Sequence, residues 1–207
     1  MTTDTDLANE ALALLGETEI SAITDQSSKN ARACLKFCAA ARVEVLRMGR
    51  WNCATKRATL VKLSAMPVAG YTSQFQLPTD FLRLMDVNGE AVKAKSEYFE
   101  IEGRALLTDE TKVWIRYIGD IGIGACDALL QAAMAVRLAG KIAIPLSGRI
   151  EQADAMETLF QRRLAEALGI DAKETGSADN SAWERIFSRS RLGRSRGNRR
   201  DPNRLGN

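Results

Sequence analysis

The chain has 207 residues, enough for one domain or one domain with a small subdomain, and its 45% hydrophobic content is ordinary for a globular protein. It contains no histidine, which excludes Ser-His-Asp and Cys-His catalysis and histidine-ligated metals. The net charge of +3 is unevenly distributed: from Trp183 onward eight arginines stand against Glu184 and Asp201, a net +6, whereas the preceding 182 residues carry a net −3.

No run of about 18 apolar residues is present, and the acidic start MTTDTDLANE lacks a signal-peptide pattern. We therefore expect no membrane span. The sparse cysteines, Cys34, Cys38, Cys53 and Cys126, sit in apolar segments, which indicates reduced thiols of a protein made in a cytosol. Together they could supply four metal ligands, but neither close pair has CxxC spacing, so buried structural thiols are the favoured interpretation.

The N-terminal part predicts two helices. A short helix over residues 4–15 is capped by Asp4 or Thr5 and stopped by Gly16. A connector follows, with Ile20 and Ile23 as anchors onto the core. A long helix then begins at Ser27 or Ser28 and ends at Gly49. Its expected buried face, apolar except for the stem of Arg42, contains Ala31, Cys34, Leu35, Cys38, Arg42, Val45 and Leu46.

From Lys56 the periodicity changes to that of strands. Strands are expected at residues 56–61, 74–77, 81–87, 90–93, 97–101, 105–107 and 112–118. Asn88-Gly89 predicts a two-residue hairpin turn, and Glu102-Gly103 predicts a second turn. In the last strand, Val113, Ile115 and Tyr117 should share one face.

The C-terminal half predicts two more helices. A glycine-rich joint at residues 119–124 precedes a buried helix over 126–144 that Pro145 ends. Ser147 can cap a helix over 148–168, whose apolar stripe runs from Ile150 to Ala167 and which Gly169 stops. Residues 171–181 are polar and are expected to form a linker.

The predicted fold is α+β: a long-helix bundle with an inserted small antiparallel β subdomain and an extended basic C-terminal tail. The helical body would comprise residues 1–55 and 120–170, the β subdomain residues 56–119, and the linker and arginine-rich tail residues 171–207.

The residues point to no catalytic, cofactor-binding or metal site. The glycines at 119, 122 and 124 have the wrong order for a GxGxxG loop and no Lys-Ser/Thr follows, so a hinge is the default interpretation. Acidic residues are scattered, and no spacing singles out an acid–base pair. We expect no enzymatic activity, and nothing in the sequence supports a hydrolase.

The arginine-rich tail is the sharpest chemical feature. Its arginines can neutralise phosphates of a nucleic acid or pair with carboxylates in an acidic protein groove, and a solvated tail is the third reading. No aromatic residue follows Phe187, so the tail has no side chains on which bases could stack. Binding to an acidic protein groove is therefore favoured over binding to a nucleic acid. Trp183, Ile186 and Phe187 would be an apolar anchor at the root of the tail.

Several short motifs occur in an order that resembles the tail tubular protein A family of short-tailed phages, the head-to-tail adaptor. They span residues 5 to 170, although Cys53 stands where an aromatic residue is more usual and the arginine-rich tail is not part of the pattern. The motifs are Asn9-Glu10-Ala11-Leu12 with Leu14-Leu15-Gly16; Arg42 with Val45-Leu46 and Trp51-Asn52-Cys53-Ala54; Tyr71 and then Leu77-Pro78-Thr79-Asp80-Phe81-Leu82-Arg83; Tyr98 with Ile101-Glu102-Gly103; and Arg137-Leu138-Ala139.

The resemblance implies a structural adaptor at the head-to-tail junction of the virion. Such adaptors form a ring, typically a dodecamer, whose helices face the portal protein and whose β subdomain faces the tail nozzle protein, while DNA passes through the lumen. We hypothesise that the loops containing Asn88, Gly89 and Gly103 face the nozzle and that the arginine-rich tail binds an acidic surface of the portal. The hypothetical portal-binding residues are Trp183, Arg185, Ile186, Phe187, Arg189, Arg191, Arg194, Arg196, Arg199, Arg200 and Arg204.

The alternative function is a nucleic-acid-binding module whose arginine-rich tail contacts packaged DNA. It predicts a steep salt dependence of DNA affinity, because each phosphate contact releases counterions.

Overall fold

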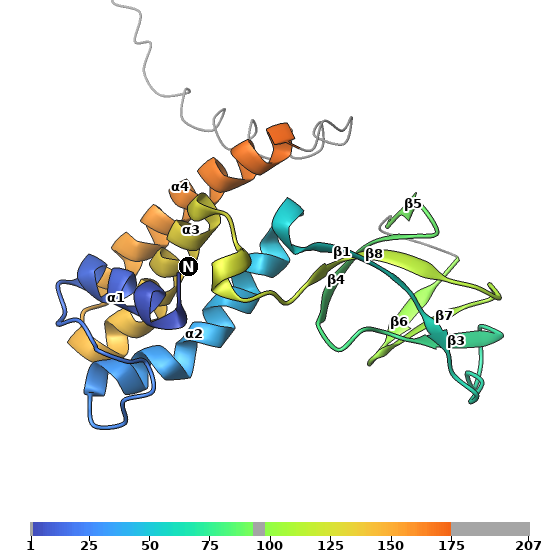
Figure 1. Cartoon of the computed structure of the whole chain (residues 1–207), viewed down its shortest axis with the longest axis horizontal. Coiled ribbons are helices and arrows are strands. Elements are labelled where there is room, and N and C mark those ends of the chain that lie inside the picture. The colour runs from blue at the N-terminus through green and yellow to red at the C-terminus, as the bar shows by residue number, and fades with distance from the viewer. Residues whose placement is uncertain (1, 93–97, 175–207) are drawn as a thin grey trace, which may run out of the picture. The chain divides into compact units, whose positions relative to one another are not determined.

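The computed structural model describes residues 2–92 and 98–174 and has a mixed α+β fold (Figure 1). Its helices are α1 (Asp4–Leu15), α2 (Lys29–Met48), α3 (Ala128–Ser147) and α4 (Ile150–Glu174), with short 3₁₀ turns η1 (Asn52–Ala54) and η2 (Ile123–Ala125). One compact unit spans Met1–Asp171; of the second, Ala172–Asn207, only the end of α4 is described.

All eight described strands lie between α2 and α3 in the chain, in two antiparallel four-stranded sheets. The first sheet has the order β1-β8-β4-β5 and the second β2-β3-β7-β6. The strands are β1 (Thr55–Thr59), β2 (Val61–Lys62), β3 (Ser73–Gln76), β4 (Phe81–Val87), β5 (Glu90–Ala91), β6 (Glu100–Glu102), β7 (Ala105–Thr108) and β8 (Trp114–Gly119).

The fold has two hydrophobic cores. Helix α3 packs against α1 and α2 to build the larger core, which Phe160, Leu164 and Ala167 of α4 complete. The smaller core lies between the strands and is built around Phe75, Leu106 and Ile115. Strand β8 serves both cores, because Ile115 and Tyr117 enter the smaller one while Ile118 enters the larger.

The local signals in the sequence place most elements correctly. α1 and β4 have the predicted bounds, Gly16 ends α1 in the left-handed conformation (φ 71°), and Ser28 caps α2. Val113, Ile115 and Tyr117 share one face as predicted, and that face is buried. The cap of α1 is Thr3, whose hydroxyl accepts from the Asp6 N–H while the Asp6 carboxylate accepts from Thr3, so the prediction of Asp4 or Thr5 was wrong.

Two predicted helix ends are wrong. α3 continues through Pro145 to Ser147, because a proline in the last turn removes only one late hydrogen bond and Gly148 (φ 69°) supplies the stop. α4 continues through Gly169 to Glu174, into residues expected to form the linker. Asn52 holds this extension: its backbone N–H donates to Asp171 Oδ1 at 2.9 Å and its amide to the Asp171 carbonyl at 3.0 Å.

Two residues of the predicted apolar faces lie at the surface instead. Leu35 is 42% exposed and Ile150 is 63% exposed, whereas Ala41 occupies the centre of the buried α2 face. Small residues at this face let α2 and α3 approach closely.

Helix α3 is long and apolar enough to cross a membrane, and half of its most apolar stretch is buried in the structure. A core helix of a soluble protein has the same length and composition. The expectation that the chain has no membrane span therefore stays a prediction.

Gly49 ends α2 for a packing reason. Its backbone is extended (φ −110°), but a Cβ atom there would lie 2.3 Å from Cε2 of Trp51. The Trp51 indole is 1% exposed and donates to the Val45 carbonyl at 3.0 Å, so it cannot easily move aside.

We expect Gly49→Ala to lower the free energy of unfolding by about 1–3 kcal/mol, the usual cost of overpacking a buried site. Gly169→Ala is the matched control: it lies inside α4 with no atom within 4 Å of the added methyl group, and should be neutral or stabilising by about 0.5–1 kcal/mol. Urea denaturation followed by circular dichroism measures both. Equal stability of the two variants would contradict the packing role of Gly49.

Candidate interaction surfaces

The two turns expected to face a tail nozzle have the conformations that their sequences predict. Asn88 and Gly89 connect β4 to β5 with φ of 50° and 87°, and Gly103 connects β6 to β7 with φ of 56°. A hairpin turn with two positive φ values matches the right-handed twist of the strands. The two turns belong to different sheets.

The Asn88-Gly89 turn packs beside Trp114, which is 40% exposed. Asn88 Oδ1 accepts from the Trp114 N–H at 3.0 Å, and the Asn88 N–H donates to the Trp114 carbonyl at 2.9 Å. A Cβ on Gly89 would lie 3.6 Å from the Trp114 ring. Tryptophan is enriched among the residues that contribute most of the binding energy at protein interfaces.

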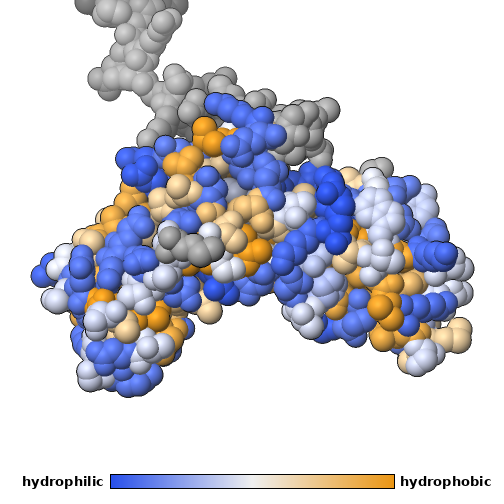
Figure 2. All heavy atoms as spheres, viewed as in Figure 1, coloured by the Kyte–Doolittle hydropathy of each residue, from blue (hydrophilic) through white to orange (hydrophobic). Residues whose placement is uncertain are grey.

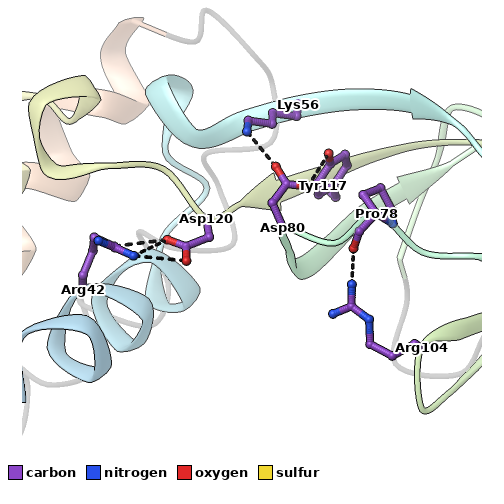
Figure 3. Close-up of polar contacts among 7 residues, drawn as sticks. All are labelled: Arg42, Lys56, Pro78, Asp80, Arg104, Tyr117 and Asp120. Atoms are coloured by element: carbon purple, nitrogen blue, oxygen red, sulfur yellow. Dashed lines mark hydrogen bonds and ion pairs between the residues drawn. The ribbon is translucent and has the colours of Figure 1, made fainter.

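The Gly103 turn is joined to the segment before β4. The Arg104 guanidinium donates to the Pro78 carbonyl (Figure 3), and the Arg104 carbonyl accepts from the Leu77 N–H at 3.0 Å. These contacts fix the position of the turn relative to β4.

Large apolar side chains remain at the surface of the strands. In the space-filling view, apolar surface lies among polar side chains over this part of the molecule (Figure 2). Val68, in the loop after β2, is fully exposed, and Val61 and Met66 are each 72% exposed. The other exposed large apolar side chains from the described strands and their loops are Val92, Tyr98, Ile101 and Trp114.

An ion pair links α2 to the connection between β8 and α3. Arg42 Nε and Nη2 donate to the two carboxylate oxygens of Asp120 at 3.1 and 3.2 Å, in the bidentate arrangement of Figure 3. The side chains are only 19% and 33% exposed. The Asp120 N–H also donates to the Asp80 carbonyl at 2.7 Å. The glycine-rich segment expected to be a hinge is thus held on two sides.

Asp80 is the centre of a second polar cluster (Figure 3). Its carboxylate accepts from Lys56 Nζ at 2.6 Å and from the Tyr117 hydroxyl at 3.0 Å. Burial raises the Asp80 pKa, but these hydrogen bonds and the charge of Lys56 outweigh it, so the pKa lies below its usual 3.8. Burial and the bond to Asp80 raise the Tyr117 pKa to about 12. Gly119 fits this cluster because a Cβ there would lie 2.9 Å from Asp80 Oδ2.

Arginines make two further connections. Arg83 in β4 donates to the carbonyls of Arg47 and Gly49, each at 2.7 Å, which joins the first sheet to the end of α2. Arg137 in α3 pairs with Glu44 of α2 and Glu157 of α4, and its guanidinium lies 5.0 Å from the Phe160 ring centroid.

The sequence interpretation missed these partners, although one signal was present. An arginine on an otherwise apolar helix face, as at Arg42, requires a buried partner. Asp120 and Asp80 have no such local signal, because their partners come from distant segments.

The predicted portal-binding residues, from Trp183 to Arg204, lie outside the described residues. Within the described part of the chain, no group of three or more His, Cys, Asp or Glu side chains is placed to hold a metal ion. Cys34, Cys38 and Cys126 are buried free thiols, whereas Cys53 is exposed, so the expectation of burial was wrong for Cys53.

Comparisons with protein-family models and with curated proteins find no match to this chain.

We expect Asp80→Asn to lower the free energy of unfolding and to make that free energy depend less on pH in the acid range. Because the Asp80 pKa is lowered on folding, its stabilisation is present above about pH 4 and lost as pH falls through the folded value. The variant should lose about 1–2 kcal/mol at pH 7 and lose less further stability than wild type between pH 7 and about pH 3. Urea denaturation across this range measures both effects.

Asp154→Asn, on the exposed surface of α4, is the matched control and should leave stability within about 0.5 kcal/mol of wild type. Equal acid-induced losses in wild type and Asp80→Asn would show that the Asp80 cluster does not contribute to folding stability.

Proposed function

We propose that this chain is a non-enzymatic structural adaptor of a phage virion, which forms a ring at the head-to-tail junction, joins the portal protein to the tail nozzle protein, and lets DNA pass through its lumen. In this proposal the chain is made in the host cytoplasm and requires no cofactor or metal. The helices act as a long-helix bundle that makes the ring, typically twelvefold, and the inserted strands act as a β subdomain facing the nozzle.

The main support for the proposal is that the fold has two hydrophobic cores, which charged contacts join to each other. The elements around each core also leave large apolar side chains at the surface. An adaptor needs separate contact surfaces whose relative position is fixed. Arg42–Asp120 and the hydrogen bonds from Arg83 to the carbonyls of Arg47 and Gly49 supply such connections between helices and strands. The large apolar side chains exposed on or beside the described helices are Leu14, Leu35, Ile144, Ile150 and Ile170.

The motifs that resemble the tail tubular protein A family support the same fold. The Asn9 side chain pairs with both the N–H and the carbonyl of Ile20, and Trp51 is buried at the end of α2. Asp80 and Arg83 join strands to neighbouring segments. These residues of the resemblance therefore have structural roles in the fold, whereas others, such as Tyr98 and Ile101, lie at the surface.

The arginine-rich tail is assigned to the portal. Removing residues 188–207 should abolish saturable co-sedimentation with the portal ring of the same virus, because seven arginines are lost, while circular dichroism of the body stays unchanged. Replacing those seven arginines by lysine is the matched control: it keeps the charge but removes bidentate pairing with carboxylates, so portal affinity should fall partly.

Duplex DNA in place of the portal tests the alternative. Binding to DNA that depends on the tail, falls steeply with salt and survives the arginine-to-lysine replacement, together with no binding to the portal, would support the nucleic-acid-binding module instead. Unchanged portal affinity after the truncation would remove the tail from the proposed interface.

The Asn88-Gly89 turn and Trp114 are assigned to the nozzle. Trp114→Ala should weaken binding to the nozzle protein at least about tenfold, the effect expected for an interface tryptophan, without changing the oligomeric state. Val68→Ala, in the loop after β2, is the control and should change affinity less than about threefold. Sedimentation velocity and titration calorimetry measure the two quantities. Equal effects of both substitutions would contradict this placement of the interface.

A further inference from the structure

The face of α2 that points away from the core is positively charged along most of its length. Its residues recur at steps of three and four, which places them on one side of the helix, opposite the buried residues. We call this face the basic stripe; it consists of Lys29, Arg32, Lys36, Ala40, Val43 and Arg47. Val43 is half-buried and the other five side chains are exposed.

No carboxylate neutralises the basic stripe within the part of the chain that the structure describes. Three of its cations donate to backbone carbonyls, and Nζ of the fourth, Lys36, lies 5.4 Å from the Phe37 ring centroid. The only carboxylate in α2 is that of Glu44, which lies off the stripe and pairs with Arg137 and Lys141 of α3. The stripe therefore keeps its positive charge available for an acidic partner.

The outward face of α1 carries the opposite charge. We call this face the acidic stripe; it consists of Asp6, Glu10, Leu14 and, just after the helix, Glu17. α1 contains no lysine or arginine, and Leu14 is 37% exposed. Asp6 caps the helix through Oδ2, but a carboxylate can accept further hydrogen bonds. Burial raises the Glu10 pKa, and Arg163 of α4 only partly opposes this rise.

The two stripes have the same order of charged and apolar positions. From its N-terminal end, the acidic stripe has two carboxylates, one leucine and a third carboxylate. From Arg32 onward, the basic stripe has two cations, two apolar residues and then Arg47. The first two steps are four residues long in both stripes, which corresponds to about 6 Å each along a helix.

This correspondence allows α1 of one copy to lie beside α2 of another copy in the same direction. Asp6 would then face Arg32, and Glu10 would face Lys36. Leu14 would contact the apolar centre of the basic stripe instead of water. Among the described residues, no ion pair joins α1 to α2 of the same copy, so both stripes remain available to a neighbour.

The apolar centre of the basic stripe also distinguishes between classes of partner. A nucleic acid presents an unbroken row of phosphates, which Ala40 and Val43 would not bind. A protein surface with an apolar residue between carboxylates fits this arrangement better, because protein interfaces combine apolar contacts with a charged rim. The acidic stripe of α1 is such a surface on the same chain.

We propose that the chain binds a second copy of itself head to tail, with the acidic stripe of α1 in one copy against the basic stripe of α2 in the next. Because the two stripes differ, each copy can bind one neighbour on each side, and such a contact closes into a ring when its rotation permits. This inference rests on the ring in the proposed function and names the helix faces that meet in it.

The test is sedimentation velocity of the full-length chain over a range of concentrations at low and moderate salt. Wild type should self-associate, and salt should weaken the association by screening the facing charges. Lys36→Glu and Glu10→Lys should each weaken it at least about tenfold, because like charges then face each other. Both positions are exposed, so circular dichroism should be unchanged.

Combining the two substitutions provides a rescue that a general loss of folding cannot imitate. The double variant Glu10→Lys/Lys36→Glu again places opposite charges face to face and should recover self-association, as should an equimolar mixture of the two single variants. Arg162→Glu, at an exposed position of α4 outside both stripes, is the matched control. It makes the same change of charge as Lys36→Glu and should leave self-association unchanged.

Three results overturn the proposal. The first is a wild-type chain that stays monomeric at every concentration and at low salt. The second is a double variant that recovers no association, or a control that loses as much as Lys36→Glu. The third is unchanged self-association of Lys36→Glu together with weaker binding to duplex DNA or to the portal ring, which would assign the basic stripe to that partner.

The portal and nozzle measurements separate this inference from the adaptor role. A chain whose stripes do not pair, but which still binds the portal and the nozzle protein, would keep the adaptor role and lose this inference. Self-association that follows the charges of the stripes, with no binding to either partner, would keep the inference and remove the adaptor role.

Discussion

The fold depends on the polar contacts that join its two cores. A bidentate ion pair such as Arg42–Asp120, which is largely shielded from water, contributes about 1–3 kcal/mol through its charge-assisted hydrogen bonds. The exposed pair Arg163–Glu166 within α4 contributes only a few tenths of a kcal/mol. Losing one partner at the junction costs more than the pair contributes, because the other charge stays partly buried and unpaired. The position of the strands relative to the helices is therefore sensitive to single residues. Gly119 is one of them, because a side chain there would collide with Lys56 and Asp80.

The sequence predicted what depends on neighbouring residues and missed what depends on distant ones. The apolar spacing of α2, the alternation in β8 and the Asn88-Gly89 turn are local patterns, and each gave the observed structure. The end of α4 could not be predicted this way, since Asn52 holds Asp171 from 119 positions away. The α+β class followed from the order of helical and strand-like segments, but the division of eight strands between two sheets follows from pairings such as β3 with β7 that no local pattern encodes.

In the candidate surfaces, too, some features follow from neighbouring residues and others depend on distant ones. Turn conformations at Asn88, Gly89 and Gly103 follow from residue type, because these residues tolerate positive φ. Trp114 lies at the surface beside the Asn88-Gly89 turn because of the strand register. This register places Lys112, Trp114 and Arg116 on the side opposite the buried face. Cys53 was assigned to the interior from its apolar neighbours, yet η1 turns it outward while Ala54 next to it is fully buried. A one-residue difference in a 3₁₀ turn separates a core position from an exposed one, and composition does not resolve that difference.

The residues on which the family resemblance depends support a shared architecture, but they do not determine a binding partner. Arg42, Asp80 and Arg83 act at joints of the fold, and Asn9 and Arg137 hold helices and their connections in place. Sequences that share these residues have a physical reason to share an architecture. The binding partner is determined by other residues, namely the side chains at the surface of the fold. These can vary with little loss of stability. The adaptor role therefore depends on whether the apolar side chains over the strands and the arginines of the tail bind two different partners at once, because a ring with only one working surface would not connect a portal to a nozzle.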